Sequence, residues 1–89
     1  MIEREYHTYL KLERGLSDNS IVAYELDFNR LKTYMEEHQI DVVHATFDDL
    51  QAFVFETFKG IKSAKTQARL LSSIHSFYRF LLYHRYIEQ

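Results

Sequence analysis

The chain has 89 residues, a net charge of −2 and neither cysteine nor proline. Its length predicts one small domain over residues 1–89, and 46% hydrophobic with 16% aromatic residues are enough for a single core, which excludes a globally disordered chain. The absence of cysteine excludes a disulfide scaffold, a thiol nucleophile and a thiolate metal site, and it is consistent with a cytoplasmic protein.

The first helix is expected over Ile2–Arg14. Its apolar residues have helical spacing and are Ile2, Tyr6, Tyr9 and Leu10, with Leu12 beside them. Gly15 follows, and glycine fits the left-handed backbone conformation that commonly ends a helix. The pattern therefore predicts the first turn of the chain directly after Arg14.

The second helix is expected from Ser17, a good N-cap residue, to about His38. Its apolar residues recur at alternating intervals of three and four and predict one buried stripe: Ile21, Tyr24, Phe28, Leu31 and Met35. The segment Gln39–Ala45 is expected to be a loop. Its apolar residues are predicted to lie against the core: Ile40, Val42 and Val43.

A third helix is predicted to begin at Thr46, because Asp49 stands three residues on and completes a capping box. Its inward residues are Leu50, Phe53, Val54 and Phe58. Gly60 is expected to stop this helix. No strand pattern of useful length occurs, so the sequence predicts an all-α fold, a compact four-helix domain.

The fourth helix is expected from the cap Ser63 to Tyr86. Cations and hydroxyls share one face of it without any carboxylate: Lys65, Arg69, Ser72, Ser76 and Arg79, widened by Lys62, Thr66 and Ser73. We call these eight residues the polar stripe. The residues on the opposite side are predicted to face the core: Ala64, Ala68, Leu71, Ile74, Tyr78 and Leu81. Because a solvated helix face usually mixes both signs of charge, the polar stripe predicts contact with an anion.

The charges are unevenly distributed along the chain. Residues 1–58 contain five Lys/Arg against twelve Asp/Glu, a net charge of −7, whereas residues 59–89 contain six against one, a net charge of +5. The net charge of −2 therefore hides a local positive field.

Two junctions join a glycine to a helix start that carries hydroxyl or amide side chains: Ser17, Asn19 and Ser20 in the first, Ser63 and Thr66 in the second. Helix N-termini attract phosphates, but each of these serines can equally be a plain cap. Lys62, Lys65 and Arg69 beside the second junction favour anion binding there.

The sequence contains no pattern typical of a metal, cofactor or catalytic site. The histidines lack metal-ligand spacing, there is no glycine-rich phosphate loop, and the adjacent carboxylates Asp48 and Asp49 would point in different directions on a helix. Tyr24 and Tyr78 belong to apolar stripes, so we expect them to pack in the core. We expect no metal and no cofactor.

Two sequence blocks resemble the amino-terminal domain of tyrosine recombinases of the Xer and phage-integrase type. The first is LERGLSDNSIVAYELDF, residues 12–28, similar to a family pattern Leu-Glu-Arg-Gly-Leu-Ser-x-Asn-Thr followed by Ala-Tyr and an Asp. The second is Lys65-Thr66 with ARLLSSI, residues 68–74, followed by Phe77-Tyr78 and Leu81. The two blocks lie at the spacing that the family shows.

The resemblance implies a non-catalytic core-binding, SAM-like domain. Such a domain grips the duplex of a recombination site through its second and fourth helices, while a separate carboxy-terminal domain, expected after residue 89, cleaves and rejoins the strands. The implied partners are double-stranded DNA, that catalytic domain and other recombinase protomers.

The candidate DNA-binding residues follow from the resemblance and the polar stripe together: Asn19, Ser20, Tyr24, Lys62, Ser63, Lys65, Thr66, Arg69, Ser72, Ser73, Ser76 and Arg79. Arg69, nearer the helix start, is expected to contact a base edge and Arg79 a phosphate. Asp18, Glu25 and Asp27 could accept a hydrogen bond from cytosine or repel phosphates, and the sequence leaves this open.

The alternative is a helical protein-interaction module, in which the acidic half docks on a basic partner and the polar stripe is merely solvated. No membrane partner is expected under either interpretation, because no apolar run approaches the ~20 residues of a membrane span and no signal peptide opens the chain.

Overall fold

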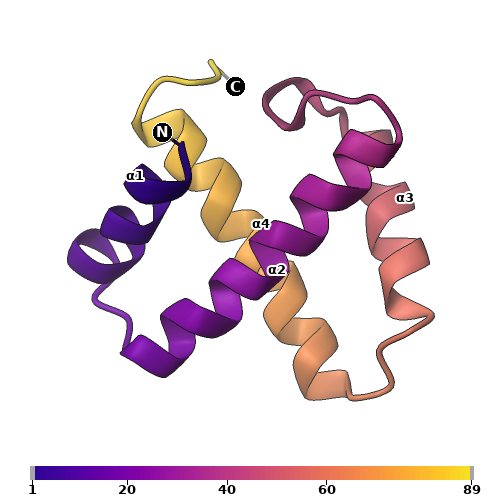
Figure 1. Cartoon of the computed structure of the whole chain (residues 1–89), viewed down its shortest axis with the longest axis horizontal. Helices are drawn as coiled ribbons and strands as arrows, with labels where there is room; N and C mark the ends of the chain where they lie inside the picture. Colours follow the sequence, from indigo (N-terminus) through magenta and orange to yellow (C-terminus); the bar gives the residue numbers. More distant parts are fainter. Residues whose placement is uncertain (1, 89) are drawn as a thin grey trace.

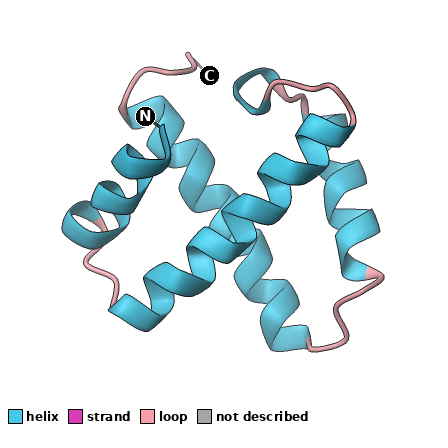
Figure 2. Ribbon diagram, in the orientation of Figure 1, coloured by secondary structure: helices cyan, strands magenta, loops and turns pink. Residues whose placement is uncertain are grey.

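The computed structural model of the protein describes residues 2–88 and contains four α-helices: α1 (Ile2–Thr8), α2 (Asp18–Glu37), α3 (Phe47–Phe58) and α4 (Ala64–Tyr83). A π-helical turn, η1 (Tyr9–Glu13), continues α1, and a short 3₁₀ turn, η2 (Val42–His44), follows α2. Within residues 2–88 there is helix and loop but no strand (Figure 2). The all-α, four-helix fold predicted from the sequence is confirmed.

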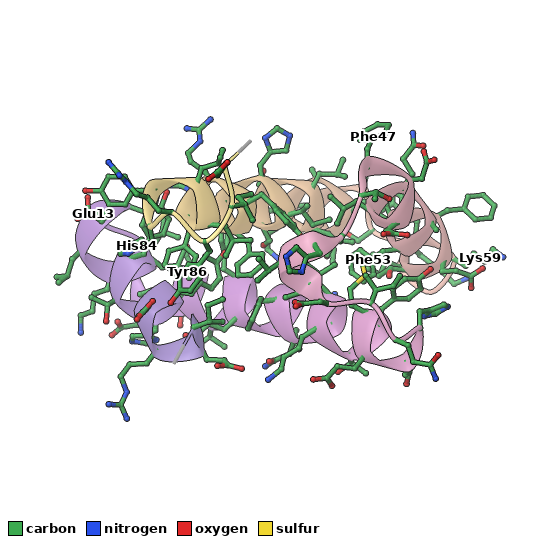
Figure 3. All side chains as sticks on the ribbon, turned by 90° about the horizontal axis from the view of Figure 1, so that it is seen from above. Glu13, Phe47, Phe53, Lys59, His84 and Tyr86 are labelled. Atoms are coloured by element: carbon green, nitrogen blue, oxygen red, sulfur yellow. The ribbon has the colours of Figure 1, made fainter. Side chains whose placement is uncertain are left out.

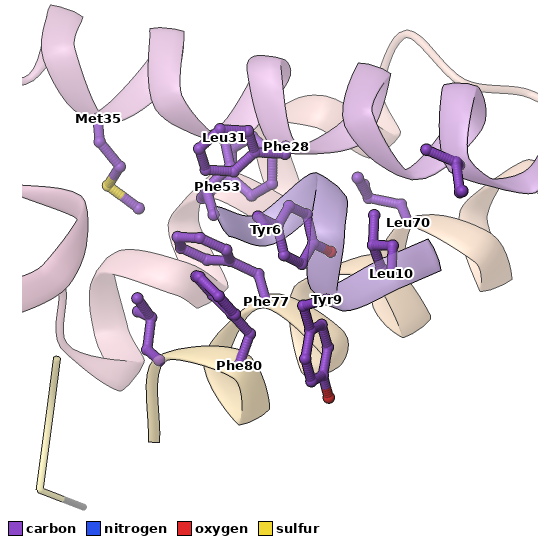
Figure 4. Packing of buried hydrophobic residues seen from close by; sticks show 12 residues of the cluster. Tyr6, Tyr9, Leu10, Phe28, Leu31, Met35, Phe53, Leu70, Phe77 and Phe80 are labelled. Carbon is purple, nitrogen blue, oxygen red and sulfur yellow. The ribbon is translucent and has the colours of Figure 1, made fainter. Parts of the chain in front are cut away.

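The two long helices α2 and α4 cross near their middles, and α1 and α3 lie on opposite sides of the crossing (Figure 1). At the crossing the rings of Phe28 and Phe77 lie with their centroids 4.7 Å apart. Tyr6 of α1 packs edge-on against Phe77 at 5.3 Å. This aromatic cluster, seen in Figure 4, is part of the buried core: Tyr6, Tyr9, Leu10, Ile21, Phe28, Leu31, Met35, Phe53, Leu70, Phe77, Phe80 and Leu81.

The predicted caps are confirmed. The Ser17 hydroxyl accepts from the backbone N–H of Ser20 at 3.3 Å, and Ser63 accepts from Thr66 at the same distance. Thr46 and Asp49 form the reciprocal bonds of a capping box, 2.9 and 3.1 Å long. These bonds satisfy donors that the first helical turn leaves without partners, which explains why the starts of helices were readable from local chemistry.

The end of the first helix differs from the prediction in one respect. Gly15 has the expected left-handed backbone, with φ of +62°. Before it, however, the helix widens into η1, where the N–H of Arg14 donates to the carbonyl of Tyr9. Tyr9 and Leu10 are buried as predicted, whereas Leu12 is 73% exposed, because the wider turn rotates it away from the core.

The predicted inward face of α4 is wrong by part of a turn. Its buried residues are Leu70, Ser73, Ser76, Phe77, Phe80 and Leu81. Of the residues expected to face the core, only Leu81 is fully buried, and Leu71 is 44% exposed. Ile74 and Tyr78 are half-buried, and the Tyr78 hydroxyl donates to the Val42 carbonyl at 2.7 Å. The polar stripe is therefore turned partly into the protein.

The other predicted inward positions agree better with the structure. The stripe of α2 is buried except for Tyr24, which is half-buried. In α3 only Phe53 is fully buried, while Ile40, Val42 and Val43 pack against the core from the loop as predicted. No helix in the described part of the chain is long and apolar enough to cross a membrane.

The position of Phe77 at the helix crossing predicts a large loss of stability on its removal. Phe77→Ala leaves a cavity among rings of three helices and should lower the free energy of unfolding by about 3–5 kcal/mol, measured by urea denaturation. Phe55→Ala is the matched control, because the Phe55 side chain is 68% exposed, and it should change stability by about 0.5 kcal/mol or less. Equal losses in the two variants would contradict this account of the core.

Candidate nucleic-acid interface

A buried carboxylate joins α2 to α4. Asp27 of α2 has no exposed side-chain surface, and it accepts two hydrogen bonds from Arg69, from Nε and Nη2, each 2.8 Å long. The hydroxyl of Ser73, one turn further along α4, donates to the same carboxylate at 2.8 Å. Arg30 adds a longer bond of 3.2 Å. Asp27 therefore faces α4 and not the solvent, which answers the open question about its orientation.

This pairing changes what Arg69 can do. The hydrogen bonds that Arg69 donates to the Asp27 carboxylate raise the pKa of Arg69, so its guanidinium stays charged. Its side chain is 30% exposed, and among its three nitrogens only Nη1 is not used by Asp27. Asp27 occupies the Nε–Nη2 edge, so Arg69 can contact an external partner only through the Nη1–Nη2 end of the guanidinium, which keeps three N–H donors.

Two serines of the polar stripe lie inside the protein. Ser73 and Ser76 are 3% and 2% exposed, so their predicted place on an exposed face is wrong. Ser73 binds Asp27, and Ser76 accepts a hydrogen bond of 2.9 Å from Arg14. Ser73 supplies a hydrogen bond to the buried Asp27 carboxylate, and the Ser76 hydroxyl is satisfied by Arg14, which explains how both polar side chains can be buried.

The remaining cations of the polar stripe are exposed. Lys62, Lys65 and Arg79 lie on the surface of the junction and of α4, together with Ser63 and Ser72, and Thr66 is half-buried. Within residues 2–88 none of these three cations forms an ion pair. By contrast Lys59 pairs with Glu56 at 3.2 Å and lies over the Phe55 ring at 4.8 Å.

The start of α2 presents smaller polar groups. Asn19 is exposed, Ser20 is half-buried, and the Ser17 hydroxyl lies 3.2 Å from that of Ser20. Of the neighbouring carboxylates, Asp18 is exposed in the first turn, whereas Glu25 lies 2.6 Å from Nδ1 of His7. The three acidic residues whose role the sequence leaves open therefore differ in the structure: Asp18 is exposed, Glu25 lies beside His7 and Asp27 is buried.

A polar hollow of about 500 Å³ lies between α4 and the end of the first helical segment. Its polar lining comes from both parts of the chain: Arg14, Tyr24, Ser72, His75, Ser76 and Arg79. Arg14 is absent from the candidate residues of the sequence analysis. Its only sequence signal is its position directly before Gly15, and α4 lies some sixty residues away along the chain.

An apolar groove of about 880 Å³ lies between α3 and α4, next to the polar hollow, and shares Leu71, His75 and Arg79 with it. Phe47 and Phe55 of α3 are 72% and 68% exposed, and Leu71 and Leu82 of α4 are 44% and 45% exposed. Figure 3 shows Phe47 pointing outward while Phe53 points toward α2. Within residues 2–88 no cluster of side chains could hold a metal ion.

The chain is thus a four-helix domain with the exposed cations Lys62, Lys65 and Arg79 at the start of α4 and along it. The sequence matches the family described as phage integrase, N-terminal SAM-like domain, over residues 4–84. The chain belongs to this family, which confirms the resemblance seen in the two sequence blocks. It is the non-catalytic SAM-like domain, and the catalytic domain of the family is not covered by this chain.

The relatives are considerably longer than this chain. It is 36% identical to tyrosine recombinase XerD of Yersinia pestis over 72 residues, which are 81% of this chain and 24% of that protein. It is also 36% identical to tyrosine recombinase XerD of Staphylococcus aureus over 88 residues, 96% of this chain and 29% of that protein. The chain thus spans less than a third of these relatives. No solved structure matches it.

The buried ion pair predicts a strong dependence of stability on Asp27. Asp27→Ala leaves the Arg69 guanidinium facing an empty site at the helix crossing and should lower the free energy of unfolding by about 3–5 kcal/mol, measured by urea denaturation. Glu36→Ala removes an exposed carboxylate from the same helix and should change stability by about 0.5 kcal/mol or less. Similar stability in both variants would show that the pair does not hold the helices together.

Proposed function

We propose that the chain is the DNA-binding domain of a site-specific tyrosine recombinase and that it grips the recombination-site duplex through α2 and α4. The observation that carries this proposal is the set of exposed cations Lys62, Lys65 and Arg79, which have no carboxylate partner in the described chain. Family membership supports a recombinase, and these cations supply the charge that phosphates require.

The amino-terminal end of α4 is the part best suited to the duplex. Lys62 and Lys65 flank its first turn, where the helix dipole adds a partial positive charge. The residues around them are small or polar, namely Ser63 and Thr66, so a phosphate can approach the backbone closely. Asn19, Ser20 and Tyr24 of α2 are our candidates for the second contact region.

The roles of the two arginines need to be distinguished. Arg79 is exposed and has no protein partner in the described chain, which favours a phosphate contact. Base contact by Arg69 stays a prediction, and with Asp27 in place it is limited to the Nη1–Nη2 end of the guanidinium. We leave Ser73 and Ser76 out of the proposed surface because both are buried.

Protein partners are the second part of the proposal. The curated relatives are more than three times the length of this chain, and the carboxy-terminal catalytic domain and neighbouring protomers are the partners we propose. The apolar groove between α3 and α4 supports protein contact, because it exposes Phe47, Phe55 and Leu82. Arg79 lines both this groove and the polar hollow, so a protein bound in the groove would lie directly beside the proposed DNA-binding surface. We place the protein in the cytoplasm.

Binding to duplex DNA should depend strongly on salt if the three exposed cations contact phosphates. The logarithm of the association constant against the logarithm of salt concentration should have a slope of roughly −3, at about −0.9 per phosphate. Lys65→Gln should make the slope less negative by about 0.9. Fluorescence anisotropy with a labelled short duplex measures both.

Lys11→Gln is the matched control for Lys65→Gln, because Lys11 is an exposed lysine on η1, outside the proposed surface. This variant should keep the slope of the unmodified protein. A slope near zero for the unmodified protein would refute DNA binding and favour the protein-interaction alternative.

Sequence discrimination by this chain alone should be modest. If this domain and the proposed catalytic domain enclose one DNA site together, binding of either domain raises the effective concentration of the other at that site. Neither domain then needs high affinity by itself. Titration of residues 1–89 against its recombination site and against a scrambled duplex should give a small ratio of dissociation constants. Strong discrimination by the isolated chain would mean that it recognises the site without a second domain.

A further inference from the structure

We infer that the polar hollow beside α4 is a cradle for one DNA backbone phosphate, and that Arg14 is a phosphate-binding residue. This inference rests on the proposed function and adds to it a residue from outside the two helices considered so far. The hollow combines two arginines, a histidine and hydroxyl groups from segments far apart in the sequence.

The charges around the hollow favour an anion. Arg14 and Arg79 both line it, and no acidic residue does. Among the described residues neither arginine forms an ion pair, so their charges are not neutralised within this part of the protein. Two guanidinium groups at one hollow without a carboxylate repel each other, and a phosphate between them would remove that repulsion.

The position of Arg14 is determined by the fold. The π-helical turn η1 ends at Arg14, and Gly15 follows with φ of +62°, so the backbone at this residue is held by a defined turn. Nη1 of Arg14 donates to the buried Ser76 hydroxyl at 2.9 Å. This bond uses one nitrogen and holds the side chain against α4, which leaves Nη2 and Nε for a phosphate.

The other groups suit the same ligand. Ser72 and Tyr24 supply hydroxyl donors, and His75 supplies a ring nitrogen. The hollow of about 500 Å³ is open and has room for a phosphate with its neighbouring sugar. Tyr24 comes from α2 and Arg79 from α4, so the cradle connects the two helices that we propose as the DNA-binding surface.

The test is the salt dependence of DNA binding by the Arg14→Gln variant. Arg79 stays at the same phosphate, so loss of Arg14 should make the slope less negative by up to about 0.9 and weaken binding roughly 5- to 10-fold at 0.1 M salt. The probe is a labelled short duplex of mixed sequence. Arg4→Gln is the matched control: Arg4 is an exposed arginine on α1 that does not line the hollow, and this variant should behave like the unmodified protein.

Two further variants separate binding from a merely structural role of Arg14. Arg14→Lys keeps the charge and should retain most of the slope, whereas Ser76→Ala removes the bond that holds Arg14 against α4 and should make the slope less negative, by less than Arg14→Gln does. If Arg14 had only a structural role, Arg14→Gln would lower the urea midpoint of unfolding, but the folded variant would bind DNA with the salt dependence of the unmodified protein. That result would overturn the inference. So would equal slopes for Arg14→Gln and Arg4→Gln. If Lys65→Gln still reduces the slope in that case, DNA binding stands and only the cradle fails.

Discussion

The carboxylate of Asp27 lies where α2 crosses α4, fully buried, with four hydrogen bonds from Arg69, Ser73 and Arg30. Burying a charge costs roughly several kcal/mol of desolvation free energy. A buried carboxylate is therefore tolerated only when its hydrogen-bond partners are held in good geometry. The crossing of the two helices therefore cannot slide or rotate without breaking this pair. The orientation of α4, and with it every surface described above, depends on this interaction.

The rotation of α4 sorts the polar stripe into two functions. Arg69, Ser73 and Ser76 turn toward α2 and the first helical segment and hold the protein together, while Lys62, Lys65 and Arg79 stay in solvent. The same rotation exposes Leu71 and Leu82 along the groove with α3. A helix that looked polar on one side and apolar on the other thus has a buried mixed face, a basic face and an apolar face. The buried face packs against the core. In our proposal the basic face contacts DNA and the apolar face contacts protein.

What could be predicted from the sequence was local. The caps Ser17, Thr46 and Ser63 and the left-handed Gly15 depend on residues within one turn, so their chemistry is visible in the sequence. The face of α4 was not predictable in this way, because Asp27, the group that attracts Arg69 and Ser73, lies more than forty residues earlier. Periodicity shows which residues share a face but not whether small hydroxyls on it point to solvent. The hollow of Arg14 was missed for the same reason, since its lining comes together only in the fold.

The distribution of ion pairs explains how a protein with a net charge of −2 can present a basic surface. Two cations of residues 1–58 pair with acids of the same half, Lys32 with Glu3 and Arg30 with Asp27. Asp27 also neutralises Arg69, and within residues 2–88 this pair and Lys59–Glu56 are the ion pairs that join residues 1–58 to residues 59–89. The remaining cations of α4 have no such partner, so their field extends into solvent over about a Debye length, ~8–10 Å at physiological salt. The unpaired acids elsewhere on the protein would be repelled by a duplex. In our proposal this field would favour the approach of DNA with the exposed cations facing it, before any contact is made.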